Sequence, residues 1–193
     1  MLSYKESLKI LKETNALLEG HFLLSSGLHS ERYVQCAKLL SKPEKAKALC
    51  FSLAEKIKEK YQNIDLILSP AIGGIVIGYE IGRILNIETI FAERVNGIFA
   101  LRRDFEIKKG QKVLIVEDVI TTGKSSLECS NLVKKMSAEL LGYACIIDRS
   151  DGKSDISKTI VSQIKIEIPT YKKENLPKHL EKIQAVKPGS RNL

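Results

Sequence analysis

The sequence predicts an α/β fold in which helices flank a mostly parallel central sheet. Short apolar, β-rich runs, such as "IDLILSP" (64–70) and "KVLIVED" (112–118), alternate with segments of helical periodicity. This alternation is typical of a parallel sheet that is covered on both faces. A length of 193 residues, with 44% hydrophobic and 28% charged residues, fits a soluble globular protein with a sizeable core.

The N-terminal part is expected to form a small attachment to this core. Leucines at helical spacing predict a helix over residues 4–18, with Gly20 as its stop. Residues 21–36 then read as two strands joined by a turn at the Ser-Ser-Gly step.

The next helix is expected to begin at the sequence "SKPE". Ser41 suits an N-cap, Pro43 suits the first turn, and Glu44 completes a capping box. Apolar residues at helical spacing continue this helix through Ile57.

Strands and helices alternate through the rest of the chain. The expected order is a loop and helix at 71–86, strands at 87–93 and 112–118, a helix ending near Lys135, and strands at 138–148 and 159–168. Because no repeat or linker interrupts this order, we interpret residues 1–193 as one domain. Its parts are an N-terminal segment (about 1–40), an α/β core (about 41–170) and a C-terminal helical tail (about 171–193).

The sequence carries no targeting signal that we can identify. No apolar run approaches the ~20 residues of a membrane span, and the charged, amphipathic N-terminus lacks the apolar core of a signal peptide. We therefore expect a cytoplasmic protein. The cysteines are widely spaced, which disfavours disulfides and a structural zinc site; they are Cys36, Cys50, Cys129 and Cys145.

The net charge of +8 does not by itself predict nucleic-acid binding. The lysines and arginines are scattered along expected helices and interrupted by acids, whereas nucleic-acid-binding surfaces cluster them with aromatic residues. We expect solvated helix faces, together with a positive potential that can attract polyanionic small substrates.

The stretch "KVLIVEDVITTGKSS" (112–126) raises the question of a nucleotide-binding P-loop. Such a loop requires G-x-x-x-x-G-K-[ST], and the position of its first glycine is occupied by Asp118. A carboxylate there would face the phosphates, and Glu117 adds a second one. The stretch therefore does not predict an ATPase or a kinase.

The same residues suit a single phosphate group beside a sugar. A helix N-terminus after the strand offers free N–H groups, and Gly123 permits close approach of the backbone. The acids Glu117 and Asp118 would face a hydroxyl-rich ligand or a Mg²⁺ ion at the edge where open α/β sheets bind ligands. The combination predicts a sugar phosphate as ligand, and the alternative is a capped helix whose exposed acids bind nothing.

This stretch resembles the 5-phosphoribosyl 1-pyrophosphate (PRPP) motif of type I phosphoribosyltransferases. The shared pattern is an apolar strand, two acids, two apolar residues and T-T-G-K-S. The resemblance implies that Glu117 and Asp118 hold the ribose 2′- and 3′-hydroxyls, and that the following loop holds the 5′-phosphate. The implied loop residues are Val119, Ile120, Thr121, Thr122, Gly123, Lys124 and Ser125.

Three other stretches resemble the orotate phosphoribosyltransferases of this family. The first, "GHFLLSSGLHSERYVQC", is similar to the family's N-terminal segment over the base pocket. It implies that Ser26 and Gly27 contact the base, although an ordinary hairpin has the same pattern.

The second stretch, "SPAIGGIVIG", is similar to the loop that receives the pyrophosphate of PRPP. Its glycines would leave backbone N–H groups open to an anion, and the alternative is a simple loop before a helix. The implied contacts are Ala71, Ile72, Gly73 and Gly74.

The third stretch, "IIDRSDG", places Arg149 after a strand. A guanidinium there can bind a carboxylate through two hydrogen bonds, and the resemblance makes it the partner of orotate's carboxylate. Thr121 is expected to touch the base as well. The alternative is a surface arginine paired with Asp148 or Asp151.

The chain departs from the family pattern in three places. Gly73 and Ser25 stand where many members have lysines, and the flexible loop that carries Lys and His in those enzymes looks shortened to residues 91–110. The sequence thus resembles a short-loop branch of the family. The candidate cations for the leaving group are Arg94, Arg102 and Arg103, with Lys108 as a weaker candidate. The alternative for each arginine is simple solvation.

The resemblance implies transfer of phosphoribosyl from PRPP to orotate, with Mg²⁺ held mainly through PRPP and water rather than by a residue of the chain. It also implies a homodimer. Two rival interpretations remain: a purine phosphoribosyltransferase, in which Arg149 would have no purpose, and a PRPP-sensing regulatory protein of the same fold. His21 and His29 are expected to be structural or exposed, and no role is assigned to His179.

Overall fold

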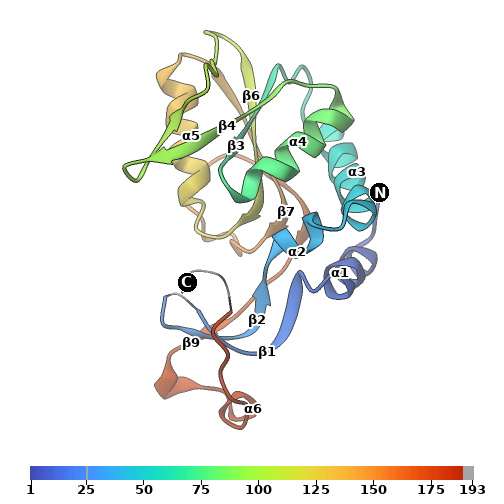
Figure 1. The fold of residues 1–193 in the computed structure, drawn as a ribbon, viewed down its shortest axis with the longest axis vertical. Helices are drawn as coiled ribbons and strands as arrows, with labels where there is room; N and C mark the ends of the chain where they lie inside the picture. Colours follow the sequence, from blue (N-terminus) through green and yellow to red (C-terminus); the bar gives the residue numbers. More distant parts are fainter. Residues whose placement is uncertain (25, 189–193) are drawn as a thin grey trace.

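Two sheets organise the chain in the computed structural model, which describes residues 1–24 and 26–188. A six-stranded central sheet has the order β5-β4-β3-β6-β7-β8, and a three-stranded sheet has the order β1-β2-β9. In Figure 1 the small sheet lies below the central one, beside the C-terminal segment. The small sheet is called the hood below.

The central sheet is mostly parallel, as predicted. All its neighbouring strands pair in parallel except β4 and β5, which form an antiparallel hairpin. The strands are β3 (Leu66–Pro70), β4 (Thr89–Val95), β5 (Ile98–Leu101), β6 (Lys112–Ile120), β7 (Glu139–Asp148) and β8 (Ile160–Lys165).

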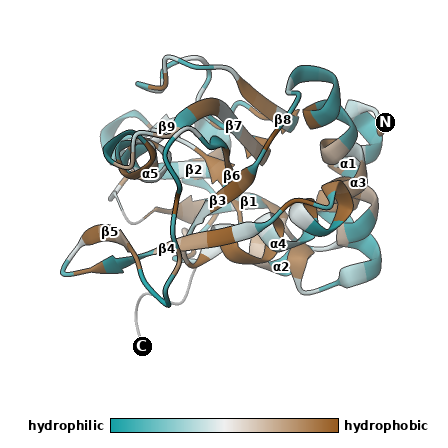
Figure 2. Ribbon diagram, turned by 90° about the horizontal axis from the view of Figure 1, so that it is seen from above, coloured by the Kyte–Doolittle hydropathy of each residue, from teal (hydrophilic) through white to brown (hydrophobic). Residues whose placement is uncertain are grey.

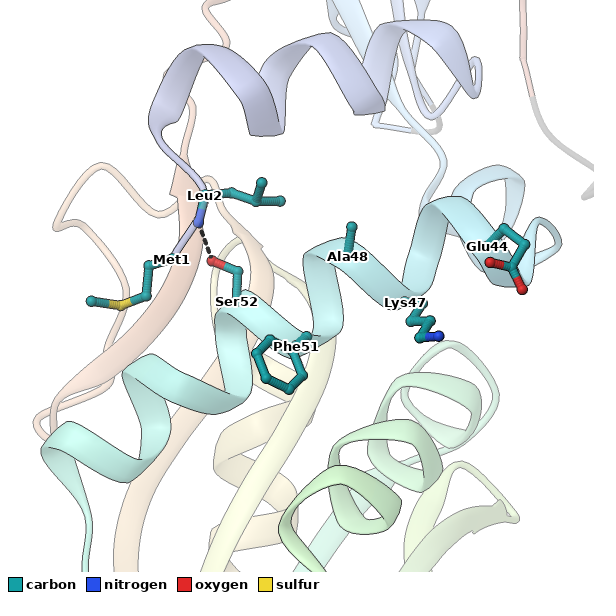
Figure 3. A pocket seen from close by; sticks show the side chains of 7 residues that line it. All are labelled: Met1, Leu2, Glu44, Lys47, Ala48, Phe51 and Ser52. Atoms are coloured by element: carbon teal, nitrogen blue, oxygen red, sulfur yellow. Dashed lines mark hydrogen bonds between the residues drawn. The ribbon is translucent and has the colours of Figure 1, made fainter.

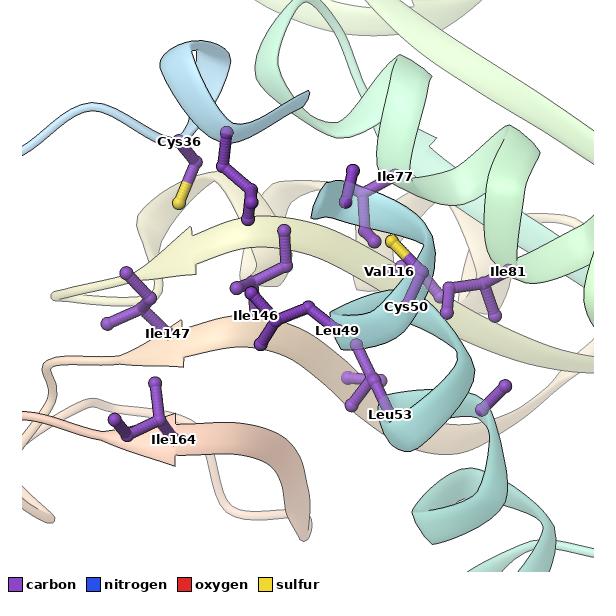
Figure 4. Close-up of a cluster of buried hydrophobic side chains, with 14 of the residues drawn as sticks. Cys36, Leu49, Cys50, Leu53, Ile77, Ile81, Val116, Ile146, Ile147 and Ile164 are labelled. Carbon is purple, nitrogen blue, oxygen red and sulfur yellow. The ribbon is translucent and has the colours of Figure 1, made fainter. Parts of the chain in front are cut away.

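Helices cover both faces of this sheet. Leu114 and Val116 of β6 belong to a core cluster with α3 (Pro43–Lys60) and α4 (Gly73–Leu85), part of which Figure 4 shows. The alternate residues of β6, such as Ile115, join a second cluster with α5 (Lys124–Lys135). Successive side chains of a strand point to opposite faces, so α5 lies opposite α3 and α4. Figure 2 shows the hydrophobic colouring concentrated on the strands between them.

The hood combines two strands from the N-terminal part of the chain with one from the C-terminal part. Its strands are β1 (Leu17–Leu23), β2 (His29–Val34) and β9 (Thr170–Tyr171). Beyond the 3-10 turn η1 (Lys173–Asn175) and the short helix α6 (Lys178–Glu181), Val186 pairs with β1: its N–H donates to the His21 carbonyl, and its carbonyl accepts from Leu23.

The expected helix over residues 4–18 is shorter than predicted. Helix α1 (Tyr4–Glu13) ends at Thr14, whose hydroxyl bonds back to the Ile10 carbonyl. The next leucines, Leu17 and Leu18, pair with β2 instead. The hydrogen bonds between β1 and β2 determine the conformation of these leucines, although their spacing is helical. The local sequence around them does not show this pairing.

The predicted cap at Ser41 is also wrong. Ser41 ends a short helix that sequence reasoning missed, α2 (Cys36–Leu40), and its hydroxyl donates to the Lys38 carbonyl. Lys42 therefore takes the N-cap position of α3, without a side-chain hydrogen bond and so without the capping box of Glu44. Pro43 occupies the first turn, as expected.

No helix in the described part of the chain has both the length and the apolar character needed to cross a membrane.

Candidate active site

The two predicted acids lie near the carboxyl end of β6, a central strand of the sheet. Because neighbouring side chains of a strand face opposite sides, Glu117 and Asp118 contact different helices. Glu117 faces α5, where it accepts a hydrogen bond from the Ser126 hydroxyl. Asp118 faces the start of α4, where its carboxylate packs against Gly73.

The environment of Glu117 disfavours its charge. Burial raises the pKa of Glu117 to about 7, and the neighbouring charge of Asp118 adds to this effect. The hydrogen bond from Ser126 acts in the opposite direction. Glu117 therefore titrates near neutral pH.

Asp118 links the strand to the 71–74 loop. A Cβ atom added to Gly73 would lie 2.7 Å from Oδ1 of Asp118, so only glycine leaves this carboxylate its present position. Burial also raises the pKa of Asp118, against hydrogen bonds from the backbone N–H groups of Val119 and of Asp118 itself.

The 121–125 loop continues directly from the acids into α5. Gly123 has a φ of +79°, and a Cβ there would lie 2.7 Å from Cδ1 of Ile156, so the position requires glycine for two reasons. Thr121, Thr122 and Lys124 are exposed. The first turn of α5 contains no acid, and its N-cap, Gly123, has no side chain to occupy the free N–H groups. The loop can therefore receive an anion.

The 71–74 loop lies at the end of the adjacent strand β3. The N–H of Ala71 donates to the carbonyl of Ala92, and the Ala71–Ile72 peptide bond is cis. Gly74 packs against Pro70 and the Val116 carbonyl. Parallel strands end at the same edge, so the structure brings this loop, the acids and the 121–125 loop together.

Arg149 follows β7 at this same edge. Its backbone N–H donates to the Ile120 carbonyl, which directly precedes the 121–125 loop. Its Nε is buried without a hydrogen-bond partner among the described residues. Burial lowers the pKa of the guanidinium, and the groups that oppose this are Cys36 and Tyr33.

The alternative role for Arg149 is wrong. Asp148 accepts a hydrogen bond from the backbone of Ser150, and Asp151 pairs with Lys153 at 2.6 Å. Neither acid forms an ion pair with Arg149 within residues 1–24 and 26–188. The buried Nε of the guanidinium is thus a hydrogen-bond donor that the described residues leave unsatisfied.

The candidate cations of the shortened loop differ in what they contact. Arg94 forms an ion pair with Glu128, with 2.7 Å between Nη1 and Oε2, and lies over the ring of Phe99. Arg103 forms an ion pair with Glu93, with 3.2 Å between Nε and Oε1. Arg102 and Lys108 are exposed, and neither has a side-chain partner in the described part of the chain. The structure therefore leaves Arg102 and Lys108 as the available cations.

The hood residues lie at the tip of the β1–β2 hairpin. Ser26 and Gly27 are exposed, and the N–H of Gly27 donates to the Leu24 carbonyl. Ser25 lies outside the described residues. The structure shows no contact between Ser26 or Gly27 and the acids, so their role with the base stays a prediction.

The histidines of the hood connect it to the C-terminal segment. His21 is hydrogen-bonded through Nδ1 to the Ile183 carbonyl and through Nε2 to Nδ1 of His29, each at 2.7 Å. Both rings are buried. His179 contacts Glu31 at 3.2 Å. His21 and His29 thus have structural positions inside the hood, whereas His179 lies exposed at the surface.

Sequence reasoning missed four neighbours of the site. They are Ser126 beside Glu117, Ile156 beside Gly123, and Tyr33 and Cys36 near Arg149. Only the position of Ser126, in the first turn after the motif, carried a local signal. The others come from distant segments.

A separate hollow of about 440 Å³ lies between the N-terminal residues and α3 (Figure 3). It is lined by Met1, Leu2, Glu44, Lys47, Ala48, Phe51 and Ser52, none of which is a predicted site residue. No cluster of three or more metal-ligating side chains occurs among residues 1–24 and 26–188.

The fold and these loops define the class of protein. The sequence model of the phosphoribosyl transferase domain family matches residues 37–182, and the chain belongs to this family. Its structure is similar to orotate phosphoribosyltransferase from Aeropyrum pernix, with a TM-score of 0.71 at 22% identity over 82% of this chain and 92% of that one. Adenine phosphoribosyltransferase from Thermoanaerobacter pseudethanolicus gives 0.59 at 20% identity over 70% and 88%. At such identities the likeness shows the type I fold alone.

Sequence relatives place the chain more narrowly. An orotate phosphoribosyltransferase from Caldicellulosiruptor bescii is 49% identical over 184 residues, which cover 95% of this chain and 96% of the relative. One from Rhizorhabdus wittichii is 46% identical over 93% of this chain and 92% of the relative. The chain is a member of the orotate phosphoribosyltransferase family.

Proposed function

We propose that this chain transfers the 5-phosphoribosyl group of PRPP to orotate, giving orotidine 5′-monophosphate and pyrophosphate, a step in the synthesis of pyrimidine nucleotides. The observation that carries the choice of substrate is Arg149. Its guanidinium is partly buried, and its Nε has no hydrogen-bond partner among the described residues. Its backbone N–H donates to the carbonyl of Ile120, which directly precedes the 121–125 loop. A carboxylate on the base would satisfy it.

The remaining contacts follow from the arrangement of the two loops. The 5′-phosphate binds at the N-terminus of α5, with the Thr121, Thr122 and Ser125 hydroxyls as further donors. Glu117 and Asp118 accept hydrogen bonds from the ribose hydroxyls. The pyrophosphate lies against the backbone of residues 71–74. In this pose the sugar spans the gap between two neighbouring strand ends.

The chain's residues promote the reaction by orientation and by stabilising charge. The bond from C1 of the ribose to pyrophosphate breaks ahead of attack by the ring nitrogen of orotate, so positive charge develops at C1. Arg149 aims the ring nitrogen by holding the carboxylate, and the two loops hold the phosphates apart. Arg102 and Lys108 are the cations available to the departing pyrophosphate.

We include Mg²⁺ in the proposal as the ion that neutralises the pyrophosphate when it is bound. Hard oxygen donors suit this ion, which keeps several of its waters in proteins. The carboxylates of Glu117 and Asp118 can accept hydrogen bonds from those waters. No side chain is proposed as a direct ligand.

A homodimer and a cytoplasmic location complete the proposal. Ile72, Val76 and Tyr79 follow one side of α4, next to the pyrophosphate loop, and are 86%, 51% and 66% exposed. Apolar side chains at such exposure suit a contact with a second copy. Light scattering should show a dimer for the wild type and monomer for Tyr79→Glu. The four cysteines are buried and unbridged, as is usual in a reducing compartment.

The activity is tested with PRPP, Mg²⁺ and each of orotate, adenine, hypoxanthine and uracil, following the release of pyrophosphate. We expect release with orotate alone. Release with a purine instead would support a purine phosphoribosyltransferase, and release with none of the four bases would support a PRPP-sensing regulator.

Arg149→Ala tests the choice of base. We expect KM for orotate to rise by on the order of 10- to 100-fold, because a charge-assisted pair is lost, while KM for PRPP changes little. Lys153→Ala is the matched control, because Lys153 is exposed and forms an ion pair with Asp151, which is not a residue of the proposed site. Unaltered orotate affinity in Arg149→Ala would remove the argument for orotate.

A further inference from the structure

We propose that Ser126 is a positioning residue for Glu117: its hydroxyl holds one carboxylate oxygen so that the other is presented to the ribose of PRPP. This inference rests on the proposed function, because it assigns Ser126 a task within that reaction. Ser126 lies outside the T-T-G-K-S sequence that resembles the PRPP motif.

The hydrogen bond from Ser126 to Glu117 crosses from a helix to a strand. The Ser126 hydroxyl donates to Oε2 of Glu117, and the Ser126 residue is fully buried in the first turn of α5. A hydroxyl has one proton to donate, so this contact uses it. Oε1 of Glu117 then remains as the acceptor for a sugar hydroxyl.

Ser130, a second buried serine of this helix, offers a comparison. It lies one turn further along α5 and is 2% exposed, and its hydroxyl donates to the Leu127 carbonyl of its own helix at 2.7 Å. This is the usual local bond of a serine within a helix. Ser126 instead gives its proton to the acid on β6, so its hydroxyl orients a side chain of the site.

Ser126 stabilises the charged form of Glu117, whereas burial and the neighbouring charge of Asp118 disfavour it. Asp118 on the same strand raises the pKa of Glu117. Cys129 of α5 and Cys145, the register partner on β7, are the other titratable neighbours, and burial raises the pKa of both thiols. On the other side, β3 (LILSP) contains no charged residue. Among the described residues that act on Glu117, Ser126 lowers its pKa against burial.

Removal of this hydroxyl should therefore alter the pH dependence of PRPP binding. Without Ser126 the pKa of Glu117 rises, so the carboxyl is largely protonated at neutral pH and offers the ribose a poorer acceptor. The loss should diminish at higher pH, where Glu117 ionises again. A defect in packing alone would persist across the pH range.

The experiment compares Ser126→Ala with Ser126→Thr, which keeps the hydroxyl, and with the control Ser130→Ala. We measure KM for PRPP and kcat from pH 6 to 9.5, and the binding of PRPP alone by calorimetry. For Ser126→Ala we expect KM for PRPP at pH 7 to rise roughly tenfold and the acid limb of kcat/KM to move up by on the order of one pH unit. Ser126→Thr and Ser130→Ala should follow the wild type.

The outcomes separate this inference from the proposed function. If the wild type releases no pyrophosphate with orotate, the proposed function fails. If the wild type is active and Ser126→Ala keeps the pH profile of Ser130→Ala, the positioning role is wrong. Thermal unfolding of each variant is measured in parallel. If Ser126→Ala does not fold, Ser126→Cys takes its place, because a thiol is a weaker donor than a hydroxyl. Its acid limb of kcat/KM is expected to lie between that of the wild type and the shift expected for Ser126→Ala. A wild-type pH profile for Ser126→Cys would overturn the inference.

Discussion

The two loops that face the proposed substrate need glycine for different reasons. In the 121–125 loop, Gly123 has a left-handed backbone, and the atoms that exclude a side chain are those of Ile156, in a distant segment. In the 71–74 loop, Gly73 has no such backbone requirement, and the atoms that exclude a side chain are those of Asp118, an acid of the site.

Gly123 is thus required by the fold, whereas Gly73 is required by the position of a site residue. At Gly123 a larger residue strains the backbone and displaces a packed side chain. At Gly73 it would displace only a carboxylate that can rotate. A mutation at Gly123 should therefore mainly lower stability, whereas a mutation at Gly73 should mainly lower activity.

Asp118→Asn should lower activity more than any change within the two loops, because Asp118 precedes one loop and packs against the other. We expect turnover to fall by on the order of 100-fold or more, since an amide is a poor substitute for a carboxylate that accepts from ribose hydroxyls. Thermal unfolding should stay close to that of the wild type. Asp65→Asn is the control, because Asp65 accepts a hydrogen bond at the opposite end of β6. Near-normal turnover in Asp118→Asn would contradict the assignment of the acid pair.

Alanine at each glycine tests the comparison directly. Gly123→Ala should lower the free energy of unfolding by roughly 1 to 3 kcal/mol, because alanine is strained in the left-handed region. Gly73→Ala should leave stability nearly unchanged and lower kcat/KM for PRPP by about tenfold, because it moves the Asp118 carboxylate. Denaturant unfolding and steady-state kinetics of both variants provide the check. Equal stability losses in the two variants would show that the distinction is wrong.

Glu117→Gln tests how the free energy of unfolding depends on pH through one acid of the site. Since burial raises the pKa of Glu117 to about 7, the folded state holds its proton more tightly than the unfolded state. Its contribution to stability is complete below about pH 4.5, falls as pH rises through about 7, and is constant above that.

Glutamine removes this dependence, so Glu117→Gln should be more stable than the wild type by roughly 1 to 3 kcal/mol at pH 8 and by less at pH 5. Urea unfolding of both proteins at the two pH values measures the difference. Glu139→Gln, at the exposed start of β7, is the control. A gain that is equal at both pH values would exclude titration of Glu117 as its source.

The sequence predicted the elements whose signals are local. The strands β3, β6 and β7 and the helix ending at Lys135 appear where the apolar runs and periodicity indicated. The β5 strand was missed although a local signal existed: Asn96 and Gly97 both have positive φ, as the two central residues of a tight hairpin turn do.

Other features could not be predicted because they depend on distant partners. Leu17 and Leu18 have a helical spacing but form a strand, because they pair with β2. A local sequence pattern does not include the residues of β2 with which they pair. In the site, the motif indicated the acids and the phosphate loop. Two features of the site depend on tertiary packing: the Nε of Arg149 has no hydrogen-bond partner among the described residues, and Arg94 forms an ion pair with Glu128.

The packing of Gly123 against Ile156 has a consequence for protein engineering. Residues 112–126 look like a motif that could be moved to another protein. However, the space around Gly123 is shaped by Ile156, and the space around Asp118 is shaped by Gly73, each in a separate segment of the chain. Grafting the motif onto another parallel sheet would transfer its acids and hydroxyls without the surroundings that place them. A successful transplant must carry three separate segments of the chain.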